Sequence, residues 1–156
     1  MYSVRLWSVT HARKLDALYR AFEPVLIKMH PLFKWVGYAR IEKPMRFVER
    51  AVKGFMFDCQ MCGKCALSST GMSCPMNCPK SIRNGPCGGV RLDGGCEVKP
   101  EMRCVWVEAW RGSQQMRDPA AIRQVQIPVD NLQKGSSSWL RVVRHEHAAH
   151  AGKAES

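Results

Sequence analysis

The sequence CQMCGKCALSSTGMSCPMNCPKSIRNGPCGGVRLDGGCEVKPEMRC, residues 59–104, contains all eight cysteines of this 156-residue chain. The first three form a C-x2-C-x2-C run, the next two form a C-x3-C pair in which a proline follows each cysteine, and the last three are single. In chain order they are Cys59, Cys62, Cys65, Cys74, Cys78, Cys87, Cys96 and Cys104. Structural zinc sites usually take four ligands from two short C-x2-C knuckles, so this run has one cysteine more than a knuckle needs. A three-cysteine run with a remote fourth cysteine followed by proline is typical of ferredoxin-type sequences, which favours iron–sulfur clusters.

Eight cysteines make two sets of four, and they can be divided in 35 ways, among which the sequence does not choose. We expect all eight to be cofactor ligands, in two 4Fe–4S clusters. Zinc at one site, or zinc alone, is the competing interpretation. The glycines among the cysteines, as in the loop 84–89, let backbone N–H groups turn toward sulfur.

No catalytic residue is expected from these cysteines. A nucleophilic cysteine needs a nearby base, usually histidine, and residues 58–104 contain none. The chain also has no phosphate-binding loop and no HExxH motif.

Composition divides the chain into three zones. Residues 1–57 lack cysteine and are predicted to be a helical N-terminal extension, residues 58–112 a cysteine-rich metal-cluster domain, and residues 113–156 an extended, partly disordered C-terminal segment. The expected fold class is therefore α+β, mostly helical, with an irregular metal-stabilised cysteine-rich core.

Apolar residues at three- and four-residue spacing predict a helix over His11–Met29, which Pro24 should kink or split. A second, short helix should begin at Pro44 and end at Gly54. A third helix is expected over Pro100–Arg111.

The C-terminal zone carries weaker signals. Cys104 should lie on the third helix, and residues 135–138 should be a flexible linker. Residues 139–143 should form a short apolar anchor. The tail histidines are expected to be solvated in a disordered end; they are His145, His147 and His150.

The formal net charge is +11, which points to an anionic partner. Thiolate ligands would offset part of this charge, and the lysines and arginines are spread without a cluster or recognition-helix pattern, so nucleic acid is not the expected partner. The first ten residues lack a signal-peptide pattern, and no run of 18 apolar residues occurs. We therefore expect no membrane association and a cytoplasmic location, where thiols stay reduced.

The residues that flank the cysteines also form a recognisable pattern. Cys59–Gly71 leads into Cys74–Lys80, followed by Asn84–Gly89, Gly95–Val98 and Cys104–Trp106. Together they closely resemble the cysteine-rich C-terminal domain family of methylenetetrahydrofolate reductase, which occurs in some bacteria as a separate small iron–sulfur subunit.

This resemblance covers residues 50–112 and includes all eight cysteines. It implies an electron-transfer accessory subunit whose partner is the catalytic flavoprotein subunit, holding FMN or FAD, which interconverts methylene- and methyltetrahydrofolate. A further redox protein is a second expected partner. The chain itself would be non-catalytic. The alternative from another class is a zinc-stabilised basic binding or structural module.

Overall fold

The structure is a computed structural model that describes residues 2–154, with side chains described to residue 149. About 57% of the chain is helical. The α-helices in residues 2–154 are α1 (Tyr2–Thr10), α2 (Ala12–Lys28), α3 (His30–Val36), α4 (Tyr38–Phe57), α5 (Val105–Ser113) and α6 (Ser138–Ala154). Single 3-10 turns lie at Pro75–Asn77, Pro119–Arg123 and Asn131–Gln133.

The prediction of a mostly helical protein is confirmed, but the β part of the α+β class is almost absent. In the described residues it consists of two isolated antiparallel bridges, Val90 with Cys96 and Gly95 with Arg103. The glycine-rich sequence around these bridges favours turns over strands.

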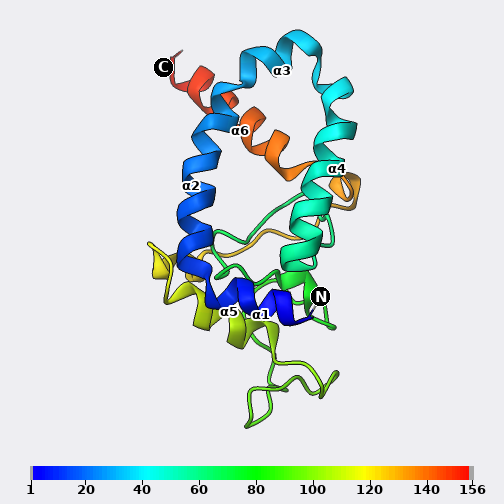
Figure 1. Ribbon diagram of the computed structural model, residues 1–156, viewed down its shortest axis with the longest axis vertical. Helices are drawn as coiled ribbons and strands as arrows, with labels where there is room; N and C mark the ends of the chain where they lie inside the picture. Colours follow the sequence, from blue (N-terminus) through cyan, green and yellow to red (C-terminus); the bar gives the residue numbers. More distant parts are fainter. Residues whose placement is uncertain (1, 155–156) are drawn as a thin grey trace.

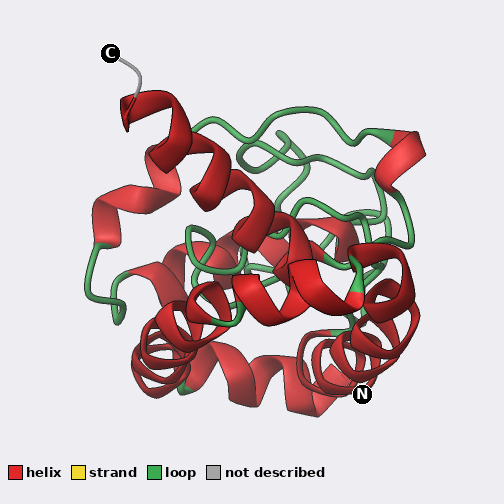
Figure 2. Ribbon diagram, turned by 90° about the horizontal axis from the view of Figure 1, so that it is seen from above, coloured by secondary structure: helices red, strands yellow, loops and turns green. Residues whose placement is uncertain are grey.

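The helices form a tall frame with the cysteine-rich loops at its lower end (Figure 1). α2 and α4 are the two sides, α3 joins them at the top, and α6 lies between them. α1 and α5 pack against each other across the base. Figure 2, seen from above, shows loops between the helices and along one edge of the molecule. None of the helices described between residues 2 and 154 is long and apolar enough to cross a membrane.

The upper core joins α2, α3 and α6. Its buried residues are Leu26, Phe33, Trp139, Leu140 and Val143. The prediction of an apolar anchor over residues 139–143 is thus consistent with the burial of these side chains. The surrounding C-terminal segment, however, is not extended, because α6 continues this anchor as a helix to Ala154.

The lower core lies around the cysteine-rich loops. Its buried residues are Ala12, Phe57, Leu67, Met72, Cys74 and Met116. Close by, α5 crosses the loop before Cys74 without room for side chains. A Cβ on Gly112 would lie 2.1 Å from the carbonyl oxygen of Gly71, so two backbones are in direct contact here.

Pro24 does not split α2, which runs from Ala12 to Lys28. Both predicted ends of the helix over residues 44–54 were wrong, since α4 begins six residues before Pro44. Tyr38, Ile41 and Met45 pack against the upper core, which stabilises the added turn of α4. α4 ends at Phe57, with Asp58 as its left-handed C-cap at φ 53°, and not at Gly54.

α5 begins at Val105, so Cys104 is its N-cap residue and does not lie on a helix starting at Pro100. The predicted flexible linker was also wrong, since Ser137 and Ser138 are buried. Of the tail histidines, His147 stacks on His30 with ring centroids 3.7 Å apart. His145 is exposed, and the side chain of His150 lies outside the described residues.

Candidate metal centre

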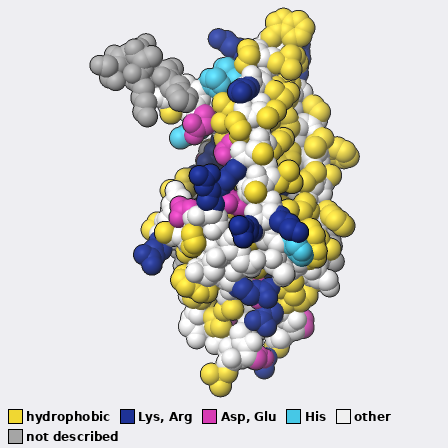
Figure 3. Space-filling view, turned by 60° about the vertical axis from the view of Figure 1, so that its left-hand side comes forward, with side chains coloured by type: hydrophobic (Ala, Val, Ile, Leu, Met, Phe, Trp, Pro, Cys, Tyr) yellow, Lys and Arg dark blue, Asp and Glu magenta, His cyan; other side chains and the backbone are white. Residues whose placement is uncertain are grey.

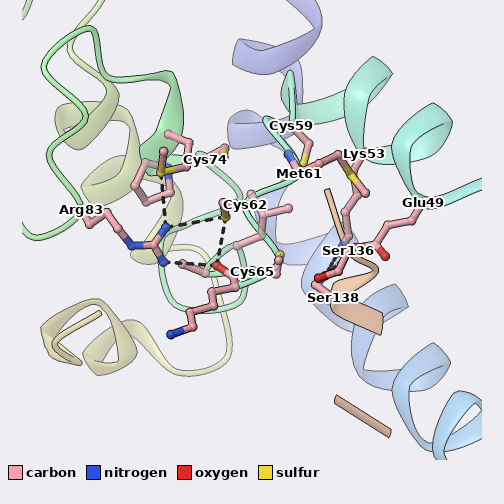
Figure 4. A pocket seen from close by; sticks show the side chains of 16 residues that line it. Glu49, Lys53, Cys59, Met61, Cys62, Cys65, Cys74, Arg83, Ser136 and Ser138 are labelled. Atoms are coloured by element: carbon pink, nitrogen blue, oxygen red, sulfur yellow. Dashed lines mark hydrogen bonds and ion pairs between the residues drawn. The ribbon is translucent and has the colours of Figure 1, made fainter. Parts of the chain in front are cut away.

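Four of the eight cysteines line a single cavity (Figure 4). They are Cys59, Cys62, Cys65 and Cys74. The first three come from the loop that follows α4, and the fourth precedes the 3-10 turn Pro75–Asn77. The structure thus joins the C-x2-C-x2-C run to the next cysteine in the chain, a choice that the spacing left open.

The cysteine run is wound tightly by residues in the left-handed region. Asp58, Met61 and Gly63 have φ values of 53°, 47° and 73°. The turn at Met61 aims its backbone N–H at Cys59 Sγ, 3.4 Å away. Such N–H···S bonds are the contacts by which a backbone orients thiolate ligands.

The segment before α6 supports the cysteine run from outside. The N–H of Gly135 donates to the carbonyl of Met61 at 2.7 Å. Arg141 donates through Nη1 to the carbonyl of Gly63 at 2.9 Å and to Gln133 Oε1 at 2.7 Å. A Cβ on Gly63 would lie 2.4 Å from the carbonyl oxygen of Gln133, so only glycine fits there.

Two hydrogen bonds place Cys74 opposite that run. Asn77 donates its side-chain N–H to the carbonyl of Phe57 at 2.8 Å, which ties the 3-10 turn to the end of α4. Ser73 donates its hydroxyl to the carbonyl of Val105 at 3.0 Å and so anchors the same segment to α5. The fourth cysteine is therefore held by two helices.

Two buried cations line the same cavity. The first, Arg83, is only 8% exposed. Its Nη1 lies 3.7 Å from Cys62 Sγ and 3.4 Å from Met76 Sδ, and its Nη2 donates to the carbonyl of Lys64 at 3.2 Å. Its Nε is buried and has no hydrogen-bond partner among residues 2–154.

The second cation, Lys53, is paired. Its Nζ lies 2.7 Å from Glu49 Oε1 and 2.8 Å from Ser138 Oγ. Glu49 also accepts the hydroxyl of Ser137 at 2.7 Å. Burial by itself raises the pKa of Glu49, but the charge of Lys53 and the hydrogen bonds from Lys53 and the two serines outweigh it and lower that pKa. The carboxylate is therefore charged at neutral pH.

Burial raises the pKa of the Cys59 thiol to about 11 and that of the Cys74 thiol to about 12. The neighbouring thiols of Cys62 and Cys65 add to both shifts, because charges of like sign disfavour each other. A metal ion or cluster that binds here must displace these protons, since the thiolate is the ligand.

Cys65 is the most accessible of the four ligand candidates. It is exposed, whereas Cys62 and Cys74 are buried and Cys59 is half-buried. Cys65 also lines a second, wider groove between α2, α4 and α6. The cysteine cavity is therefore closest to solvent on its Cys65 side.

The other four cysteines are less closely gathered. Cys87 Sγ lies 3.9 Å from Glu97 Oε1, and Glu97 forms an ion pair with Lys80. Cys96 stands in the bridge with Val90. Cys104 is buried against α5, and Cys78 follows the 3-10 turn.

Across residues 2–154, no group of three or more His, Cys, Asp or Glu side chains has the geometry to hold a single metal ion. The candidate centre is accordingly defined by the cavity that its cysteines line. Its donor set of four thiols beside two cations fits an anionic thiolate-bound group.

Sequence reasoning did not identify Arg83, Lys53 and Glu49. Glu49 and Lys53 stand four residues apart on α4, a spacing that predicts a pair but equally suits a solvated surface. Arg83 lies in a loop whose burial depends on distant contacts, so no local pattern marks it.

Comparison with known proteins identifies one family. Residues 38–132 match the model of the family described as "Methylene-tetrahydrofolate reductase C terminal". This range includes α4 and all eight cysteines. No curated protein and no solved structure matches the chain. Because the match covers more than half of the chain, the protein belongs to the methylene-tetrahydrofolate reductase C-terminal family.

Proposed function

We propose that this chain is an electron-transfer accessory subunit of a flavin-dependent methylenetetrahydrofolate reductase. The observation that carries the proposal is the cavity lined by Cys59, Cys62, Cys65 and Cys74 together with two buried cations. Four thiolates around a 4Fe–4S core of about +2 leave a charge of about −2. Arg83 and Lys53 would face that charge inside the protein.

Such a cluster, when bound, supplies one-electron exchange. The chain's own residues orient the thiolates, bury Cys62 and Cys74, partly cover Cys59 and leave the Cys65 side open. We propose that electrons pass on that side to or from the FMN or FAD of a catalytic flavoprotein subunit, with a further redox protein as the other partner. The chain would not itself reduce folate.

For a second cluster we propose the remaining four cysteines, Cys78, Cys87, Cys96 and Cys104. Zinc at this second site is the alternative. The pair of Lys80 and Glu97 lies beside Cys87, so both charges are close enough to influence the site.

The exposed surface supports a role as a subunit. Apolar side chains are spread over the upper part of the molecule in Figure 3. The exposed ones on α3 and α4 include Trp35, Phe47 and Phe55. A partner subunit that covered this surface would remove apolar area from water.

The test is anaerobic purification of the full chain, followed by iron, zinc and acid-labile sulfide analysis. Two 4Fe–4S clusters predict about eight iron and eight sulfide per chain, with visible absorbance that dithionite bleaches reversibly. The reduced chain should then reduce the flavin of a methylenetetrahydrofolate reductase flavoprotein. A chain that holds zinc with no sulfide would overturn the proposal in favour of a zinc-stabilised module.

A further inference from the structure

Arg83 occupies an unusual position for a charged side chain. It comes from the loop between Cys78 and Cys87 and reaches into the cavity of the first four cysteines (Figure 4). It is 8% exposed, so its guanidinium has lost most of its contact with water. Burying a guanidinium is costly unless an opposite charge or a full set of hydrogen bonds compensates for it.

The compensation is incomplete in the protein alone. Among residues 2–154, the groups that Arg83 contacts are a carbonyl, a thioether and the sulfur of Cys62. Its Nε has no partner there. None of these groups is a carboxylate, so among the described residues that Arg83 contacts, only the sulfur of Cys62, as a thiolate, can carry a negative charge.

Lys53 provides the contrast within the same cavity. Its charge is balanced by Glu49 at 2.7 Å. Glu49 offsets part of the charge that Lys53 presents to the sulfurs, whereas no carboxylate among the described residues offsets that of Arg83. Of the two buried cations, Arg83 is therefore the one whose charge has no carboxylate partner, and its Nη1 lies 3.7 Å from Cys62 Sγ.

We infer that Arg83 raises the reduction potential of the cluster held by Cys59, Cys62, Cys65 and Cys74, through its N–H contact with Cys62 Sγ and its unpaired buried charge. This inference rests on the proposed function. The reduced cluster carries one more negative charge than the oxidised one, so a fixed positive charge and an N–H···S bond stabilise the reduced state more. Arg83 is thus a positioning and tuning residue, not a ligand.

The experiment is a potentiometric titration of the full chain, followed by electron paramagnetic resonance, with iron and sulfide measured on the same samples. Three variants are compared with the wild type: Arg83→Gln, Arg83→Lys and the control Arg91→Gln. Arg91 lies in the same loop region but is solvent-exposed, with a loose ion pair to Asp93 at 3.7 Å.

At a fixed solution potential, Arg83→Gln should lower the ratio of reduced to oxidised cluster at least tenfold, which corresponds to 59 mV for a one-electron couple. Arg83→Lys keeps the charge but loses the planar fork, so its ratio should fall by a smaller factor, about threefold. Arg91→Gln should leave the ratio unchanged.

A ratio within twofold of wild type in Arg83→Gln, with full iron content, overturns the inference and leaves the proposed function intact. If Arg83→Gln does not retain iron, Arg83→Lys decides, and an unchanged ratio in that variant overturns the inference. A wild-type chain without iron or sulfide refutes the proposed function itself, so the two failures are distinguishable.

Discussion

Replacing Glu49 by Gln should strongly destabilise the protein, because it removes the only carboxylate that the structure pairs with buried Lys53. Glu49 is 1% exposed and Lys53 is 4% exposed. The carboxylate accepts hydrogen bonds from Lys53 Nζ and the Ser137 hydroxyl, both at 2.7 Å. Gln has nearly the same volume, so the change isolates the loss of charge.

The expected size follows from leaving Lys53 buried without its carboxylate partner. Breaking a buried ion pair by removing one partner costs about 3–5 kcal/mol. For a chain of this length each kcal/mol moves the melting midpoint by about 2–4 °C, so the midpoint should fall by about 6–20 °C. The loss should be greatest where α6 meets α4, because Ser137 and Ser138 belong to the same network.

The assay is thermal unfolding followed by circular dichroism, on samples matched for iron content. Glu101→Gln is the control, since Glu101 is exposed and the substitution changes the charge equally. Replacing both Glu49 and Lys53 by Met should cost less than Glu49→Gln alone, because no buried charge is left without a partner. A midpoint for Glu49→Gln within 3 °C of the Glu101→Gln control would refute the reasoning.

Three further predictions concern the packing of the helices and of His30. Gly112→Ala should lower the free energy of unfolding by about 2–3 kcal/mol, because the added Cβ would lie 2.1 Å from the carbonyl oxygen of Gly71. The control Gly54→Ala adds a Cβ that meets nothing within 4 Å and should stabilise α4, so equal unfolding midpoints for the two variants would contradict the close crossing. Leu140→Ala should cost about 2–5 kcal/mol in denaturant unfolding, and a change below 1 kcal/mol would mean that α6 is not docked. Partial burial and the neighbouring His147 lower the pKa of His30, so an NMR titration of His30 should give a pKa below 6.5. Because the unfolded chain then binds the proton more readily, the free energy of unfolding should fall as the pH drops through 6.5, and a pKa of 6.5 or more would contradict the stacked arrangement.

The sequence predicted the elements whose pattern is local. The apolar spacing over residues 11–29 corresponds to α2, which spans Ala12–Lys28. The length of α4 could not be predicted in the same way. Its first turns pack against the upper core, which includes residues of α6 about 100 residues away, and such contacts leave no periodic signal near Pro44.

The C-terminal segment shows the same limit. Residues 135–138 have the composition of a linker, yet Ser137 and Ser138 are buried because Glu49 accepts their hydroxyls. A serine-rich stretch that satisfies a buried carboxylate looks the same in sequence as one that is free in solvent. The residues after Val143 are mostly polar or small and predicted a disordered tail, whereas α6 continues through them to Ala154.

The cysteines themselves were found by spacing, but their grouping was not. A proline directly after the cysteine is typical of a remote cluster ligand, but it follows both Cys74 and Cys78. The sequence therefore could not distinguish between these two cysteines. The structure places Cys74 in the cavity because Met72 and Phe57 pack with it in the lower core. The assignment of the other four cysteines to a second site stays a prediction.

The central claim is that Cys59 and Cys74, fifteen residues apart, hold the same cluster. It is tested most directly by the iron and sulfide content of Cys59→Ala, Cys74→Ala and the double variant, each purified anaerobically with the wild type. Each single change should remove about four iron per chain and the same resonance signal, and the double variant should lose no more than either. Losses that add up in the double variant, or single variants that keep all their iron, would contradict the shared site.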